Sequence, residues 1–257
     1  MAIQTTEAIV LNRRDLRETS ILATFYSRDF GKIKGVLKGI RQERSRYGST
    51  AELLGLNKIV FYEKSRSDFQ NITQCDLING FFGIRKSLYA IACATYLIEL
   101  VDRLTEPAEK SHDIYGLLLN SLELLSKGED ADKITRIFEL RFLSLLGFAP
   151  ATQECAVCGE KVDLKGSSDK AKFSIRRGGM LCRRCAKEDR FAQEITMGTA
   201  QTLNHLKGAR PESLLKFKIS KSIQEELSSV IEKLVAIHIE KPLKSKKFIN
   251  QVQRLKR

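Results

Sequence analysis

Four cysteines are the residues whose spacing most strongly predicts a chemical site in this sequence. They form two Cys-x-x-Cys pairs, Cys155 with Cys158 and Cys182 with Cys185, separated by 23 residues. Two residues between thiols allow both sulfurs of a pair to turn toward one point, and a second pair completes a tetrahedral shell. Such a shell suits Zn²⁺, which thiolates bind at about 2.3 Å. The sequence therefore predicts one structural zinc ion per chain.

Disulfide bonds and metal catalysis are the alternative uses of these cysteines, and both fit less well. A chain of 257 residues can bury a core without disulfides, and its first residues lack the basic-then-apolar pattern of a targeting peptide. We therefore expect reduced thiols in a cytoplasmic protein. Four thiolates also leave no open position for a reacting water, so we expect the metal to hold a scaffold.

A second informative set of residues is basic and lies between positions 32 and 46. Lys32 and Lys34 flank Ile33, which predicts that both ammonium groups project from one face of a strand while Ile33 points inward. Arginines, glycines and Tyr47 follow. The arginines can bind phosphates, the glycines leave backbone amides accessible, and the Tyr47 ring can stack on a base. The candidate DNA contacts are Lys32, Lys34, Lys38, Arg41, Arg44 and Arg46. A solvated charged loop has the same pattern and stays an alternative.

The overall charge supports a polyanionic partner. The net charge is +13, and the isoelectric point is about 9.5. Residues 81–150 carry 8 basic and 10 acidic side chains, whereas residues 191–257 carry 13 and 6. Because the excess is local, it is typical of a nucleic-acid footprint. No apolar run approaches the length of a membrane span, so we expect no membrane partner.

Residues 1–80 must position the basic segment, and their pattern is that of short strands. Five are expected, over residues 6–11, 20–26, 32–38, 54–62 and 69–73, with turn residues between them. Five strands in about 75 residues predict a small barrel or sandwich. We expect a five-stranded OB-fold, with an SH3-like barrel as the alternative.

Residues 81–257 carry helical periodicity and must position the cysteines. Apolar residues recur at helical spacing over 84–104, 114–128 and 130–147, which predicts an all-α bundle. The zinc segment, residues 151–190, interrupts this domain, with a hairpin around Gly178 and Gly179 between its cysteine pairs. Helical patterning resumes near Thr199, another helix is expected over 221–240, and residues 241–248 form a basic tail with an apolar anchor. The predicted fold class is α+β and multidomain.

Enzyme motifs are missing from the sequence. The three histidines are scattered, no glycine-rich loop ends in GK[ST], and no carboxylate cluster suggests a two-metal nuclease. We therefore expect a binding protein that is not an enzyme.

The order of these features resembles the bacterial RecO family of recombination mediators over nearly the whole chain. The motifs that carry the resemblance are Glu7-Ala8-Ile9-Val10-Leu11, Arg14-Asp15 with Glu18, Phe25 with Gly31-Lys32, Lys38-Gly39 with Ser45-Arg46, Gly147-Phe148-Ala149-Pro150 before Cys155-Ala156-Val157-Cys158-Gly159, and Leu243-Lys244-Ser245-Lys246-Lys247-Phe248. Many members of the family, but not all, have the zinc cysteines, and this sequence keeps all four.

The resemblance implies an N-terminal OB-fold, a helical domain with a zinc insertion, and a nucleoid-associated role in DNA repair and homologous recombination. It implies binding of single- and double-stranded DNA, annealing of complementary strands and partnership with RecR. It also implies contact with the C-terminal tail of single-strand-binding protein, and so help in loading RecA. From the residues alone, an RNA-binding or RNA-modifying zinc protein and a zinc-stabilised protein adaptor remain alternatives.

Overall fold

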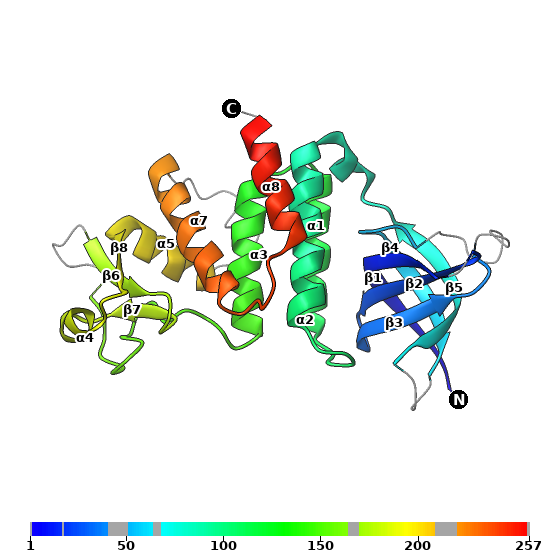
Figure 1. Ribbon diagram of the computed structural model, residues 1–257, viewed down its shortest axis with the longest axis horizontal. Coiled ribbons are helices and arrows are strands. Elements are labelled where there is room, and N and C mark those ends of the chain that lie inside the picture. The colour runs from blue at the N-terminus through cyan, green and yellow to red at the C-terminus, as the bar shows by residue number, and fades with distance from the viewer. Residues whose placement is uncertain are drawn as a thin grey trace. The chain divides into compact units, whose positions relative to one another are not determined.

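The N-terminal strands close into a barrel (Figure 1). The computed structural model describes residues 2–16, 18–40, 51–63, 68–163, 170–208 and 220–255. The strands are β1 (Ile3–Leu16), β2 (Ser20–Ser27), β3 (Gly31–Leu37), β4 (Leu56–Tyr62) and β5 (Gln70–Asn79). Their order is β1-β2-β3-β5-β4, and β4 pairs with β1 to close the barrel. With β3 and β5 parallel and the other neighbours antiparallel, the OB-fold prediction is confirmed.

Alternation of apolar and polar residues decides which side of each strand faces the barrel core. On β3, Ile33 and Leu37 are buried, whereas Lys34 is exposed and Lys32 is half-buried. The predicted inward direction of Ile33 is confirmed. The core is closed by apolar side chains from all five strands, chiefly Val10, Ile21, Phe25, Ile33, Leu37, Ile59, Phe61 and Ile72.

Three helices and a 3₁₀ turn belong to the same compact unit as the barrel. They are η1 (Phe82–Lys86), α1 (Leu88–Leu104), α2 (His112–Ser126) and α8 (Lys244–Leu255). Ser87 and Ser111 cap α1 and α2 by accepting hydrogen bonds from Ala90 N and Ile114 N. One face of α1 contacts the barrel, mainly β1, and α1 also packs against α2 and α8.

The C-terminal segment differs from the expected basic tail, because it forms the helix α8. Ile249 and Val252 are buried, and Leu243 just before the helix is buried too. The Glu99 carboxylate of α1 accepts hydrogen bonds from Lys244 N at 3.2 Å and Ser245 N at 2.8 Å. A negative charge at exposed N–H groups stabilises a helix start, so α1 helps to fix where α8 begins.

The second compact unit carries the cysteines. It contains α3 (Ala131–Leu145), β6 (Lys170–Ser174), β7 (Gly179–Leu181), α4 (Arg183–Glu188), β8 (Gln193–Thr196), α5 (Met197–Gly208) and α7 (Lys221–Ala236). The predicted hairpin is confirmed as β6 and β7, with Gly178 in the left-handed region at φ +69°. The strand β8 was not predicted, and it pairs with the other edge of β6.

The chain forms two compact units whose boundary differs from the one expected between residues 80 and 81. One unit comprises residues 1–131 with 243–257, and the other comprises residues 132–242. The expected bundle of three consecutive helices is therefore divided, with α1 and α2 in the first unit and α3 in the second. Helical periodicity predicts which face of a helix is apolar, but it does not name the element that covers that face. Among the described residues, no helix is both long enough and apolar enough to cross a bilayer.

A single carboxylate joins three segments of the second unit. The Glu226 carboxylate on α7 accepts hydrogen bonds from Thr196 N at 3.0 Å, from Thr196 Oγ1 at 2.7 Å and from Thr199 Oγ1. Burial raises the pKa of Glu226, but the hydrogen bonds from both threonines outweigh it and lower the pKa below its ordinary value of 4.5. Glu226 therefore ties α7 to the end of β8 and the start of α5.

This carboxylate makes the stability of the second unit depend on pH. Because the folded pKa of Glu226 lies below its unfolded value, its stabilisation is complete above about pH 4.5 and is lost as pH falls through the folded pKa. Glu226→Gln should lower the free energy of unfolding by about 2 kcal/mol at pH 7 and by less at acid pH. Urea unfolding at several pH values measures this. Glu225→Gln, at the exposed neighbouring position, is the control, and an equal loss in both variants would contradict the assignment.

Candidate metal centre and nucleic-acid interface

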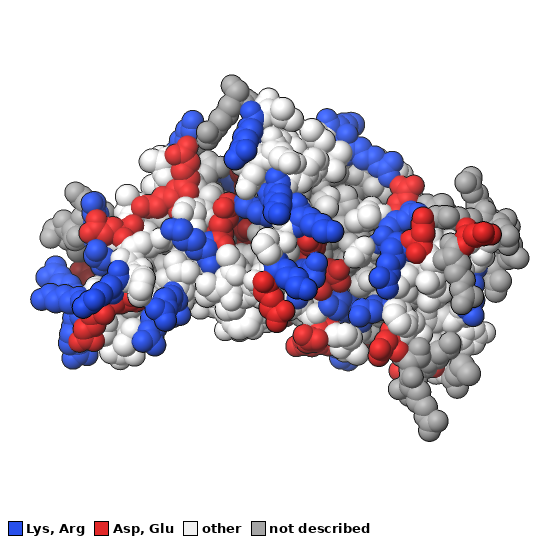
Figure 2. All heavy atoms as spheres, in the orientation of Figure 1, with Lys and Arg blue, Asp and Glu red and all other residues white. Residues whose placement is uncertain are grey.

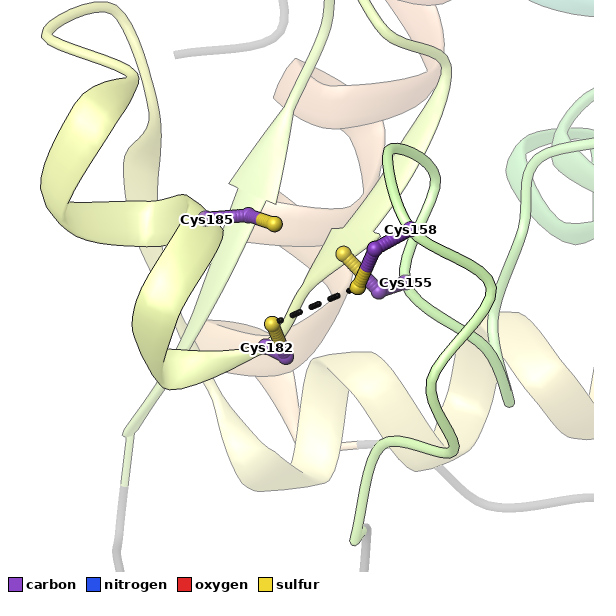
Figure 3. Close-up of side chains that lie close together, drawn as sticks. All are labelled: Cys155, Cys158, Cys182 and Cys185. Carbon is purple, nitrogen blue, oxygen red and sulfur yellow. Dashed lines mark hydrogen bonds between the residues drawn. The ribbon is translucent and has the colours of Figure 1, made fainter.

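The four predicted cysteines meet at one point (Figure 3). Their sulfurs all lie within 4.8 Å of one another, and the Sγ atoms of Cys158 and Cys182 are 3.7 Å apart. Four thiolates at about 2.3 Å from a central ion in tetrahedral geometry have sulfurs about 3.8 Å apart. All four are free thiols, so the disulfide alternative is wrong. The donor set fits a tetrahedral metal ion.

Local backbone structure brings each pair of cysteines into position. In the first pair the chain turns back, because Gly159 N donates to Cys155 O at 2.9 Å and Gly159 adopts φ +73°. In the second pair Cys182 is the N-cap of α4 and Cys185 lies in its first turn. A hydrogen bond from Ala156 N to Met180 O, 2.8 Å long, then ties the first turn to β7 just ahead of the second pair.

One glycine is needed for the two pairs to approach each other. Gly178 O accepts a hydrogen bond from Ala151 N, and Met180 N donates to Ala151 O, so the segment at residue 151 lies directly on β7. A Cβ atom at Gly179 would lie 2.6 Å from Ala151 O, which is too close for any other residue without a backbone shift. Gly179 therefore permits the contact that places Cys155 near Cys182.

The electrostatic surroundings favour the thiolate form of Cys155. Burial raises the pKa of the Cys155 thiol, but hydrogen bonds from the backbone N–H groups of Cys182, Cys158 and Val157 outweigh it and lower the pKa to about 6. Hydrogen bonds to the sulfurs of Cys158 and Cys185 raise the pKa of Arg184, so its guanidinium lies against them as a cation. Four thiolates exceed the charge of one divalent ion, and Arg184 offsets part of that excess.

Only part of the predicted basic segment lies among the residues that the structure describes. Lys34 and Lys38 are exposed on and just after β3. Arg41, Arg44 and Arg46 lie outside the described residues.

Lys32 has a different environment from the one the sequence predicted. Its Nζ donates hydrogen bonds to the backbone carbonyls of Asp102, at 2.7 Å, and Thr105, which lie at the C-terminal end of α1. Burial is the main reason that the pKa of Lys32 is lowered. A cation at the carbonyl end of a helix is stabilising. The Lys32 ammonium group thus has hydrogen-bond partners within the protein. The sequence predicted only that this group projects outward from β3 and did not predict these partners.

The end of α1 and the barrel strands together line a basic hollow of about 310 Å³. The hollow contains four cations, one acid and one aromatic ring among its lining residues, which are Asn12, Arg14, Leu22, Thr24, Lys32, Lys34, Phe69, Asp102 and Arg103. Strand register places Asn12, Thr24 and Lys34 in one cross-strand row. Phe69 is 39% exposed. The cations can bind phosphates, and the exposed ring can stack on a base.

Two basic residues of this hollow were absent from the predicted site. Alternation along β1 places the exposed Arg14 outward beside Leu22 of β2, so its position was available from the strand pattern. Arg103 lies on α1, and only the packing of that helix against the barrel brings it to the hollow. Nothing in the local sequence around Arg103 indicates a neighbour on β3.

Comparisons with known proteins assign nearly the whole sequence to one family. Residues 1–81 match the family model "Recombination protein O N terminal", and residues 85–247 match "Recombination protein O C terminal". The chain belongs to the RecO family. This RecO chain is 30% identical to the DNA repair protein RecO of Acetivibrio thermocellus over 98% of both chains. It is 32% identical to that of Caldanaerobacter subterraneus subsp. tengcongensis, covering 95% of this chain and 96% of the relative.

The metal centre of this RecO chain predicts a specific loss when one ligand is removed. Cys182→Ser should leave three thiolates, lower the metal content of the purified protein, and destabilise the second unit by on the order of 3 kcal/mol or more. Elemental analysis of purified protein and thermal unfolding measure both effects. Cys75→Ala, which changes a buried thiol of the barrel core, should keep the metal. A Cys182→Ser protein with the wild-type metal content would contradict the assignment.

Proposed function

We propose that this RecO-family chain is a DNA repair and recombination mediator that binds DNA without strong sequence preference and is not an enzyme. The observation that carries the proposal is the basic hollow of the barrel, where Arg14, Lys34 and Arg103 surround the exposed ring of Phe69. Relatives that align over nearly their whole length are named DNA repair proteins, which agrees with DNA as the partner.

The binding mode follows from the chemistry of the hollow. Arginine and lysine side chains neutralise phosphates and release counterions, so affinity should fall steeply with salt. Phosphate contacts and stacking carry little sequence information, because every nucleotide offers a phosphate and a planar face. Double-stranded DNA offers the same phosphates and is the second expected substrate. Two complementary strands held at cationic surfaces repel each other less, which supports a role in annealing.

The finer roles rest on family likeness. We propose that the protein works with RecR, contacts the C-terminal tail of single-strand-binding protein, and so helps RecA to load onto DNA that this protein covers. The proposed place of action is the cytoplasm, at the nucleoid. These roles require protein partners and no bond-making chemistry by this chain.

The metal is proposed to be Zn²⁺ in a structural role. The donors supporting this are the sulfurs of Cys155, Cys158, Cys182 and Cys185, which favour a soft or borderline ion in tetrahedral geometry. Bound there, the ion would supply cross-linking of the two cysteine turns. Since all four positions are protein thiolates, this chain's residues leave the ion no role in activating water.

The hollow is tested by reversing two of its charges. Arg14→Glu with Lys34→Glu should weaken binding of a labelled single-stranded oligonucleotide by about tenfold or more at low salt, and should reduce the slope of log K against log salt by about 1.4. Fluorescence anisotropy over a salt series measures both. Lys32 is left unchanged because its ammonium holds the end of α1.

The matched control reverses two other exposed lysines of the same unit. Lys58→Glu with Lys86→Glu makes the same change in net charge on β4 and η1. An equal loss in this control would mean that overall charge governs affinity and that the hollow is no specific contact. A wild-type protein that binds no single strand even at low salt would refute the proposed function itself.

A further inference from the structure

The surface beside the metal centre carries cations that the barrel contact does not use. Six exposed basic side chains lie within fifteen residues, namely Arg176, Arg177, Arg183, Arg184, Lys187 and Arg190. Lys and Arg side chains gather over the part of the second unit that contains α4 and β7, with fewer acids between them (Figure 2). We call residues 176–191 the knuckle face.

Two acids, Glu188 and Asp189, also line this face, and Asp189 is hydrogen-bonded within the protein. The Asp189 carboxylate accepts hydrogen bonds from Ser174 Oγ at 2.5 Å and from Phe191 N at 2.9 Å. The hydrogen bond from Ser174 is the main cause that lowers the pKa of Asp189. Asp189 therefore shapes the loop that presents Phe191, and its negative charge offsets part of the positive charge of Arg176 and Arg177.

An exposed aromatic ring stands among these cations. Phe191 is 71% exposed, although burying a phenyl ring is strongly favourable. The Arg176 guanidinium lies over the ring with its Cζ 5.3 Å from the centroid. A hollow of about 410 Å³ is lined by this pair together with Val157, Arg177, Cys185, Glu188, Asp189 and Arg190. The face thus offers a planar apolar surface with guanidinium groups around it.

We propose that the knuckle face is a second contact for a single nucleic-acid strand, with a base stacked on Phe191 and flanking phosphates held by Arg177 and Arg190. The proposal rests on the DNA-binding function proposed above and adds a contact on the other compact unit. Arg184 is not assigned to phosphate, because its guanidinium lies against the ligand sulfurs.

A single strand fits this face better than an acidic protein segment does. The carboxylates of a purely acidic segment such as polyglutamate would satisfy the arginines but would leave the Phe191 ring in water. A nucleotide supplies a phosphate and a flat base within one repeat, so it satisfies both features at once. A bound metal would then have an indirect role, since it would hold Cys182 and Cys185, which lie in the chain between Arg177 and Arg190.

The experiment uses the full metal-loaded chain and an oligodeoxynucleotide containing 5-iododeoxyuridine. Ultraviolet irradiation followed by tryptic mapping should give a crosslink in the peptide that begins at Phe191 and ends at Lys207. Phe191→Ala should weaken strand binding by about fivefold or more. Arg177→Glu with Arg190→Glu should weaken it by about tenfold at low salt. Elemental analysis checks that each variant retains its metal.

The control and the opposing outcomes separate this inference from the function on which it rests. Lys221→Glu with Lys241→Glu makes the same charge change at the start of α7 and after its end, and it should leave affinity nearly unchanged. The inference is wrong if wild-type protein binds the strand, the knuckle-face variants keep full affinity, and crosslinks map only to the barrel. The proposed function is unaffected by that outcome. Variants that lose binding of a polyglutamate peptide but not of DNA would assign the face to acidic proteins and also overturn it. A wild-type protein that binds no strand refutes both.

Discussion

The basic hollow of the barrel depends on one half-buried contact, between the Lys32 ammonium group and the last carbonyls of α1. A helix ends with carbonyl groups that lack partners, and a lysine from β3 satisfies two of them. This contact fixes the end of α1 against the outer surface of the barrel. Arg103 and Asp102 therefore become walls of a hollow whose other walls are barrel strands. Lys32, which the strand pattern predicts as a DNA contact, thus lines the hollow and also holds the end of α1 that shapes it.

The second unit depends on a different electrostatic constraint. Four thiolates within 4.8 Å of one another repel, and a cation bound between them would convert that repulsion into cross-linking. The apolar surroundings of the cysteines are small, with Leu181 as the largest buried neighbour in that cluster and alanines and Val162 around it. A core of this size supplies little hydrophobic stabilisation, so a metal ion bound by the four cysteines would be the main link between the two turns.

The two proposed contacts share one physical logic. Each combines guanidinium or ammonium groups with an exposed phenyl ring, Phe69 in one unit and Phe191 in the other. Phosphates and base planes are common to every nucleotide, so both proposed contacts would suit a strand of any sequence. A protein that pairs complementary strands must accept both members of every pair, and contacts limited to phosphates and base planes meet that requirement.

Local spacing in the sequence was enough to determine the metal ligands, the β6–β7 hairpin, the five strands and the inward direction of Ile33, because each depends on residues close together along the chain. The sequence also carried enough turn and strand pattern to favour the OB-fold. It did not reveal β8 or the helix α8, whose few apolar residues, Ile249 and Val252, become informative only when packed. Tertiary structure alone decided the environment of Lys32, because its carbonyl partners lie 70 and 73 residues away. The same holds for Arg103 and for the grouping of α1 and α2 with the barrel, since the periodicity of one segment carries no information about which distant surface will cover it.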